Sequence, residues 1–99
     1  MALSERQKKH LRRLGHALHP VVLVGQRGLT DAVIAEFRRA LADHELVKLR
    51  ARIGARETRD GLLAALAAAT ESELVHRIGN VSLFYKKNNK LKCILLPDS

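Results

Sequence analysis

The stretch VVLVGQRGLTDA, residues 21–32, decides the fold. Its four apolar residues predict a short buried strand, two glycines three positions apart follow, and Thr30 is a good helix cap. A strand that passes through a glycine loop into a helix indicates an α/β domain. The loop is also the first candidate binding site, because glycines let a ligand approach the backbone closely.

Apolar periodicity extends this pattern over the whole chain. Helices are predicted over residues 5–18, from Thr30 to about His44 and over about 57–69, the first with Leu11, Leu14 and Leu18 as its buried stripe. Strands are predicted at 21–24 and within 46–54, 73–79 and 81–87, and Asn88-Asn89 predicts a terminal hairpin between FYKK (84–87) and KLKCILL (90–96). The order α-β-α-β-α-β-β indicates one domain, residues 1–99. Its expected fold class is two-layer α/β with a four-stranded mixed sheet.

Alternation within residues 46–54 predicts a strand with one face exposed. Val47, Leu49, Ala51 and Ile53 take the buried face, and Lys48, Arg50 and Arg52 form a row on the other unless the first helix covers them. Cys93, the single cysteine, lies in an apolar run where a small buried thiol fits. The sequence has neither an apolar run long enough to span a membrane nor a secretory signal, so a cytoplasmic location is expected.

The charge is strongly basic, with 18 Lys and Arg against 10 Asp and Glu, a net charge of +8. It is concentrated in residues 1–28, 48–59 and 76–99, and the two segments between them are acidic. Folding could therefore gather the basic segments on one side. Such an excess favours a polyanionic partner.

The glycine loop suits phosphate. The helix that follows it begins with unpaired N–H groups and the positive end of its dipole, which attract an anion. Arg27 adds a cation and Gln26 a neutral donor, so the loop could hold a sugar-phosphate backbone without reading bases. The alternative is an ordinary strand-to-helix turn. Mononucleotide and dinucleotide fingerprints are excluded, because no Lys-Ser/Thr pair or third glycine follows.

Cations also line the first predicted helix away from its leucine stripe, namely Arg6, Lys8, Lys9, Arg12 and Arg13. Only Glu5 offsets them there, which favours a binding surface over a merely solvated face. Lys86, Lys87, Lys90 and Lys92 cluster near the C-terminus, where some of them could serve solubility alone. Phe37, Phe84 and Tyr85 are too few for a protein that stacks bases on exposed rings, so recognition of backbone and shape is expected.

Catalysis finds no support in the sequence. The five histidines lack metal-ligand spacing, and no hydrolase or metalloprotease motif occurs. We therefore expect no enzyme activity, no cofactor, no small-molecule substrate and no membrane partner, and a monomeric chain.

The combination of HPVVLVGQRGLT (19–30), HELVKL (44–49) and RET (56–58) resembles the YhbY family of single-domain bacterial proteins, built on the chloroplast RNA splicing and ribosome maturation (CRM) domain. The resemblance covers essentially the whole chain and is strongest from Leu11 to Arg50. It implies a fold similar to the C-terminal domain of the third bacterial initiation factor. It also implies a loop comparable with the GXXG loop of KH domains, here Gly25, Gln26, Arg27 and Gly28.

The resemblance further implies RNA binding and association with precursors of the large ribosomal subunit. The sequence therefore predicts a ribosome-assembly factor that grips ribosomal RNA through residues 25–28 and the basic first helix, with Lys48 and Arg50 as further contacts. Two alternatives remain open from the residues. One is a protein adaptor whose basic surface meets an acidic partner, and the other is a nonspecific DNA-binding protein.

Overall fold

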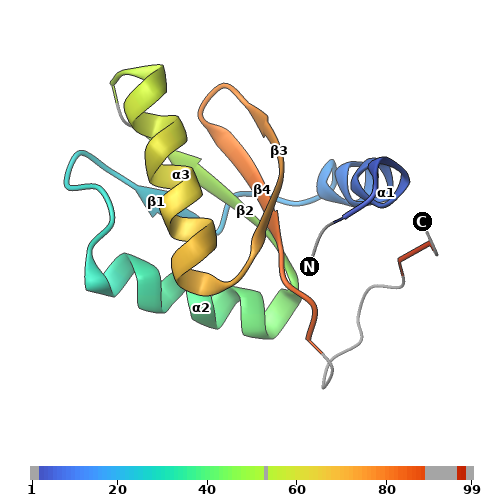
Figure 1. Cartoon of the computed structure of the whole chain (residues 1–99). Helices are drawn as coiled ribbons and strands as arrows, with labels where there is room; N and C mark the ends of the chain where they lie inside the picture. The colour runs from blue at the N-terminus through green and yellow to red at the C-terminus, as the bar shows by residue number, and fades with distance from the viewer. Residues whose placement is uncertain (1–2, 53, 89–95, 98–99) are drawn as a thin grey trace.

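The computed structural model describes residues 3–52, 54–88 and 96–97. Its elements are α1 (Glu5–Gly15), β1 (Val22–Val24), α2 (Asp31–His44), β2 (Leu46–Ala51), α3 (Arg56–Thr70), β3 (Glu73–Ile78) and β4 (Val81–Tyr85). The strands form one sheet in the order β1-β2-β4-β3, with β1 parallel to β2 and the other neighbours antiparallel (Figure 1). The predicted α/β fold with a four-stranded mixed sheet is confirmed.

The main core lies between one face of the sheet and the two helices α2 and α3. Its strand residues are Val22, Val24, Val47, Leu49, Ala51 and Phe84. Phe37 of α2 meets Phe84 of β4 edge to face, with ring centroids 4.9 Å apart. The alternation predicted for residues 47–51 is therefore confirmed, and it leaves Lys48 and Arg50 on the opposite face of the sheet.

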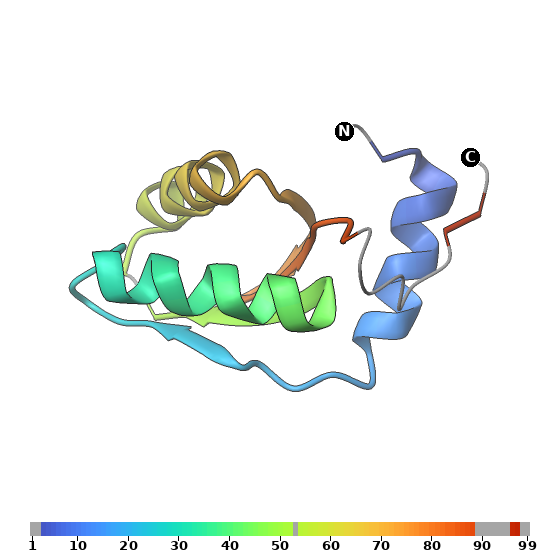
Figure 2. The ribbon, with the colours of Figure 1, turned by 90° about the horizontal axis from the view of Figure 1, so that it is seen from below.

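Helix α1 covers part of that opposite face. Leu11 is fully buried there in a cluster with Leu46, Val75 and Leu83. A Cβ on Gly15 would lie 2.8 Å from the Leu83 side chain, so the missing side chain is what lets the helix approach the sheet. Figure 2 shows α1 apart from the α2 and α3 layer, beside one end of the sheet.

The prediction for the first helix was wrong about its C-terminal end and about two of the three leucines expected to be buried. The helix ends at Gly15 rather than residue 18, and Leu14 and Leu18 are 39% and 37% exposed. The contact with the sheet runs through Leu11 and Gly15, which lie one turn apart on the same side. Gly15 therefore makes the contact between the helix and the sheet that the leucine pattern assigned to Leu14 and Leu18.

A β-bulge interrupts β3. The pairing register with β4 shifts between Leu74 and His76, so that Val75 is an extra residue. Leu74 packs against the main core, and Val75 packs with α1 on the other face. After the bulge, His76 and Ile78 lie on the α1 side, whereas Arg77 pairs with Asp60 of α3 at 3.0 Å.

A tight turn at Gly79 and Asn80 joins β3 to β4, and Gly79 has a φ of +58° there. The hairpin predicted around Asn88-Asn89, the burial of Cys93 and the inward orientation of Ile53 lie outside the described residues. No helix in the described ranges is long and apolar enough to cross a bilayer.

Candidate nucleic-acid interface

The loop of residues 25–28 is a tight turn between β1 and α2. The Gly28 N–H donates to the Gly25 carbonyl at 3.0 Å, and Gly28 has a φ of +70°. Gln26 and Arg27, at the turn's two central positions, are exposed. Gly25 has no positive φ, and a Cβ there would meet open space. Only Gly28 is therefore required by the backbone, and the bare Gly25 leaves an accessible stretch of main chain.

The first turn of α2 lies beside this loop. The Thr30 side chain accepts a hydrogen bond from the Val33 N–H at 3.1 Å, which caps the helix as predicted. The first helical N–H groups have no acceptor within the helix. The Asp31 carboxylate complements the helix dipole here and would compete with an anion at this position. The helix end alone is therefore a weak anion site, and the exposed Arg27 guanidinium supplies the positive charge of the loop.

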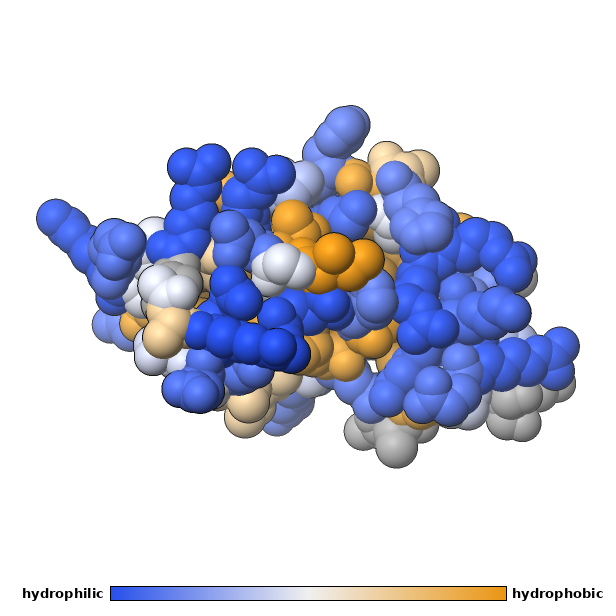
Figure 3. All heavy atoms as spheres, turned by 90° about the horizontal axis from the view of Figure 1, so that it is seen from above, coloured by the Kyte–Doolittle hydropathy of each residue, from blue (hydrophilic) through white to orange (hydrophobic). Residues whose placement is uncertain are grey.

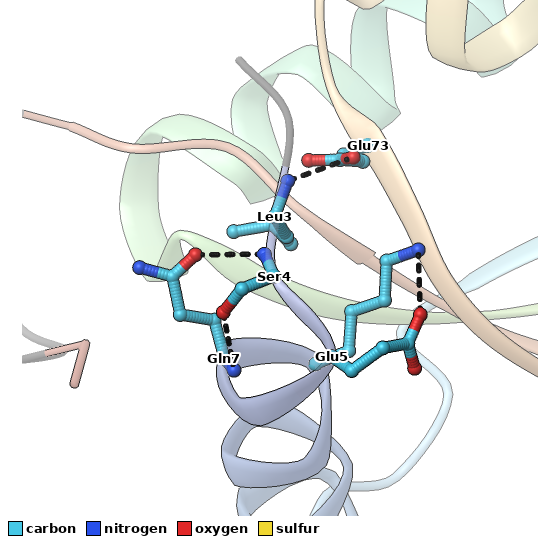
Figure 4. A network of polar contacts seen from close by, with 6 residues as sticks. Leu3, Ser4, Glu5, Gln7 and Glu73 are labelled. Carbon is cyan, nitrogen blue, oxygen red and sulfur yellow. Dashed lines mark hydrogen bonds and ion pairs between the residues drawn. The ribbon is translucent and has the colours of Figure 1, made fainter. Parts of the chain in front are cut away.

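Helix α1 is held firmly at its N-terminus (Figure 4). The Ser4 hydroxyl accepts from the Gln7 N–H at 3.1 Å, and the Gln7 side chain accepts from the Ser4 N–H at 3.0 Å, which together form a capping box. The Leu3 N–H donates to the Glu73 carboxylate of β3 at 3.2 Å. These bonds fix the helix that carries five of the predicted contacts.

The cations of α1 divide into two groups. Arg6, Lys9 and Arg13 are exposed, and Lys8 and Arg12 are half-buried against the domain. The only ion pair within α1 in the described structure joins Lys8 to Glu5 at 4.0 Å, a surface pair of small energy. The helix therefore presents nearly uncompensated positive charge.

A cleft of about 230 Å³ lies between the end of α1 and the sheet. Arg12 and His16 border it from the helix side, and Lys48 and His76 border it from the strands. None of its nine lining residues is acidic. Burial, and then the charges of Arg12 and His16, lower the pKa of His76 below its ordinary value. This cleft is therefore an electropositive environment that disfavours a further positive charge.

The structure does not gather the predicted site residues in one place. The loop of residues 25–28 lies at one end of the molecule and α1 at the other (Figure 1), along a longest dimension of 38 Å. Lys48 and Arg50 lie on β2 between them, both half-buried, and the Lys48 ammonium donates to the Leu18 carbonyl at 3.2 Å. The predicted row of strand cations exists, and α1 covers only the Lys48 end of it.

The sequence pattern did not predict the exposed apolar residues on the sheet face opposite the main core. Leu23 and Ile78 are 66% and 68% exposed, and Val21 is 56% exposed. Residues 21–24 were predicted as a wholly buried strand, because an unbroken apolar run has no alternation to reveal an exposed face. Figure 3 shows apolar side chains surrounded by hydrophilic ones in the view from above.

Other predicted features have simple structural outcomes. Phe84 and Tyr85 are both buried, so neither ring is available for stacking. Lys86 donates to the Thr70 carbonyl at 3.0 Å, Lys87 is exposed, and Lys90 and Lys92 lie outside the described residues. Within those residues, no group of three or more His, Cys, Asp or Glu side chains could hold a metal ion.

The chain is similar in sequence and in fold to proteins that are named for RNA binding. "Probable RNA-binding protein PA4753" of Pseudomonas aeruginosa is 47% identical over 90 residues, which cover 91% of this chain and 86% of that protein. An RNA-binding protein of Haemophilus influenzae is 39% identical over 95 residues, which cover 96% of this chain and 95% of that protein. The solution structure of Staphylococcus aureus SAV1595, described as a candidate RNA-binding protein, superposes with a TM-score of 0.85 at 31% identity, covering 97% of this chain and all of that one. The CRS1/YhbY (CRM) domain model matches residues 3–86, and the chain therefore belongs to the CRS1/YhbY (CRM) domain family.

Proposed function

We propose that this protein is a cytoplasmic RNA-binding factor that associates with precursors of the large ribosomal subunit and assists their assembly. One observation carries the proposal. Lys48 and Arg50 of β2 lie on the sheet face between the Gly25–Gly28 loop and α1, and the cleft that Lys48 shares with Arg12 of α1 has no acidic lining. The relatives named as RNA-binding proteins support a nucleic acid as the partner.

The distance between the loop and α1 favours a folded RNA over a short oligonucleotide. Contacts to phosphate carry little sequence information, so selectivity depends on several cationic segments engaging one shape together. Partly assembled ribosomal RNA offers such a shape. Mature subunits have more of this surface occupied by ribosomal proteins.

The loop is tested by the double variant Gln26→Asp/Arg27→Asp, measured by fluorescence anisotropy with a structured ribosomal RNA fragment. Binding should weaken severely, whereas the thermal midpoint should stay within a few degrees, because exposed substitutions usually change stability by about 0.5 kcal/mol or less. Asp31→Asn is the matched control. It removes a competing carboxylate beside the same loop and should tighten binding. Unchanged RNA affinity in the double variant would contradict the role of the loop.

The partner is tested by two further measurements. Duplex DNA of equal length should bind more weakly than structured RNA across a salt series, and equal binding would favour the nonspecific DNA-binding alternative. On a low-salt sucrose gradient of cell lysate, the protein should sediment with large-subunit particles, enriched in precursors, and high salt should strip it off. A protein that stays at the top of the gradient would favour the adaptor alternative.

A further inference from the structure

The uncovered part of the sheet carries a straight row of four side chains. Leu23 of β1 is paired with Arg50 of β2, Arg50 with Val81 of β4, and Val81 with Ile78 of β3. These residues all lie on the face opposite the main core, and they sit side by side because neighbouring strands are about 4.8 Å apart. We call these four residues the cross-strand row.

The cross-strand row has an apolar side chain at each end and one cation, Arg50, between them. Its two outer side chains, Leu23 and Ile78, are the most exposed large apolar residues described, at 66% and 68%. Isolated exposed leucines are ordinary, but here the register places them in line with an arginine between them. Arg50 presents a planar guanidinium, which can stack on a base as well as bind phosphate.

We propose that the cross-strand row is a platform for unpaired bases of the bound RNA, built from aliphatic side chains and one arginine in place of aromatic rings. This inference rests on the proposed RNA-binding function and adds a second mode to it. The loop and α1 hold phosphates, and the row contacts the faces of bases between them.

Charge identifies RNA as the occupant. Beside the row stand Arg12, Lys48 and His76, which border the cleft that also contains Ile78 and Val81. Because no acidic residue lines the cleft, the negatively charged RNA backbone can lie beside these cations while its bases contact the aliphatic side chains. An apolar protein partner would have to bury these cations without counter-charges, at a large desolvation cost.

Position and size agree with a single strand. Leu23 lies two residues before Gly25, so the row adjoins the loop proposed to hold phosphate. The cleft of about 230 Å³ is smaller than the roughly 300–1,000 Å³ of pockets that enclose a drug-sized molecule. It can admit one planar base while the rest of the strand stays outside. A base within a duplex would have its faces already stacked on its neighbours and unavailable.

The test compares two probes, a labelled single-stranded oligouridylate and a blunt RNA duplex of equal phosphate number. Leu23→Ser/Ile78→Ser removes apolar surface without changing charge. It should weaken single-strand binding about tenfold, with an unchanged salt slope, and change duplex binding less than about twofold. Leu14→Ser/Leu18→Ser, which replaces partly exposed leucines outside the row, is the matched control and should leave both affinities unchanged.

Arg50→Lys separates stacking from charge. The lysine keeps the cation but loses the planar group, so single-strand affinity should fall by a larger factor than duplex affinity, with an unchanged salt slope. Far-UV circular dichroism and thermal midpoints establish that each variant is folded.

Equal losses on both probes, or no loss on either, would overturn the platform. In both cases the unmodified protein still binds both RNAs, which differs from failure of the proposed function, in which it would bind neither.

Discussion

The two glycines of the loop should respond in opposite ways to alanine. Gly28 has a φ of +70°, in the left-handed region, where a side chain costs about 1–2 kcal/mol. A Cβ at Gly28 would lie 3.6 Å from the Leu62 side chain, an ordinary contact that adds no clash. Gly28→Ala should therefore destabilise the fold by backbone strain alone, and lower the thermal midpoint by about 4–8 °C per kcal/mol in a domain of this size.

Gly25→Ala should not destabilise the fold. Position 25 has no positive φ, and its Cβ would point into open space. Alanine at a compatible position reduces the freedom of the unfolded chain, and typically stabilises by about 0.4–1 kcal/mol. A rise in the thermal midpoint of a few degrees is expected. If Gly25 exposes the main chain to phosphate, the same variant should bind structured RNA more weakly.

The assay is thermal unfolding followed by circular dichroism, with RNA anisotropy on the same samples. Opposite shifts of the two midpoints, with weaker RNA binding in Gly25→Ala, are the expected result. A fall in the midpoint of Gly25→Ala would refute the geometric reasoning about stability. Unchanged RNA affinity in a stabilised Gly25→Ala would refute the close approach of phosphate to this residue.

Three other predictions follow from features described above. The first prediction replaces four cations of α1 with glutamine, namely Lys8, Lys9, Arg12 and Arg13. The slope of log affinity for RNA against log salt concentration should become flatter by about 0.7 to 0.9 for each phosphate that is no longer neutralised. The control Arg38→Gln/Arg39→Gln on α2 should leave that slope unchanged. Phe37→Ala should cost about 3–5 kcal/mol in urea unfolding, because the ring is fully buried against Phe84; a cost under about 1 kcal/mol would contradict this packing. The pKa of His76 is lowered in the folded state, so its contribution to stability is present above the unfolded value of 6.5 and is lost as the pH falls through the folded value. When the pH is lowered from 7.5 to 5.5, the thermal midpoint of His76→Asn should therefore fall less than that of the unmodified protein. Equal falls would show that His76 does not cause the loss of stability at the lower pH.

Periodicity predicted the fold well wherever burial on one face set the pattern. The strand alternation from Val47 to Ala51 and the Thr30 cap were read directly from residue types. The end of α1 was predicted too late, because a leucine pattern continues past Gly15 although the packing contact does not. A glycine that is used for close approach looks in sequence like a weak point in a helix.

The candidate site was predicted in its parts but not in its arrangement. Composition identified the cations of α1 and β2, and the strand-glycine-helix pattern identified the loop, yet neither indicates that loop and helix lie at opposite ends of the domain. The cross-strand row could not have been found from sequence. Its members come from four strands, and only the register aligns Leu23 with Ile78.

The bulge at Val75 lets β3 put two consecutive side chains on the same face. Val75 packs in the cluster beneath α1, and His76, the next residue, borders the cleft on the same side. Deletion of Val75 alone would leave Leu74 opposite Phe84 and His76 opposite Leu83 in regular alternation, so Arg77 would still reach Asp60 and Ile78 would stay on the exposed face. A single-codon deletion in β3 would thus spare the exposed face of the sheet and remove one apolar contact of α1. Among relatives, a β3 shorter by this one residue is then a marker of chains in which the first helix is held less tightly against the sheet.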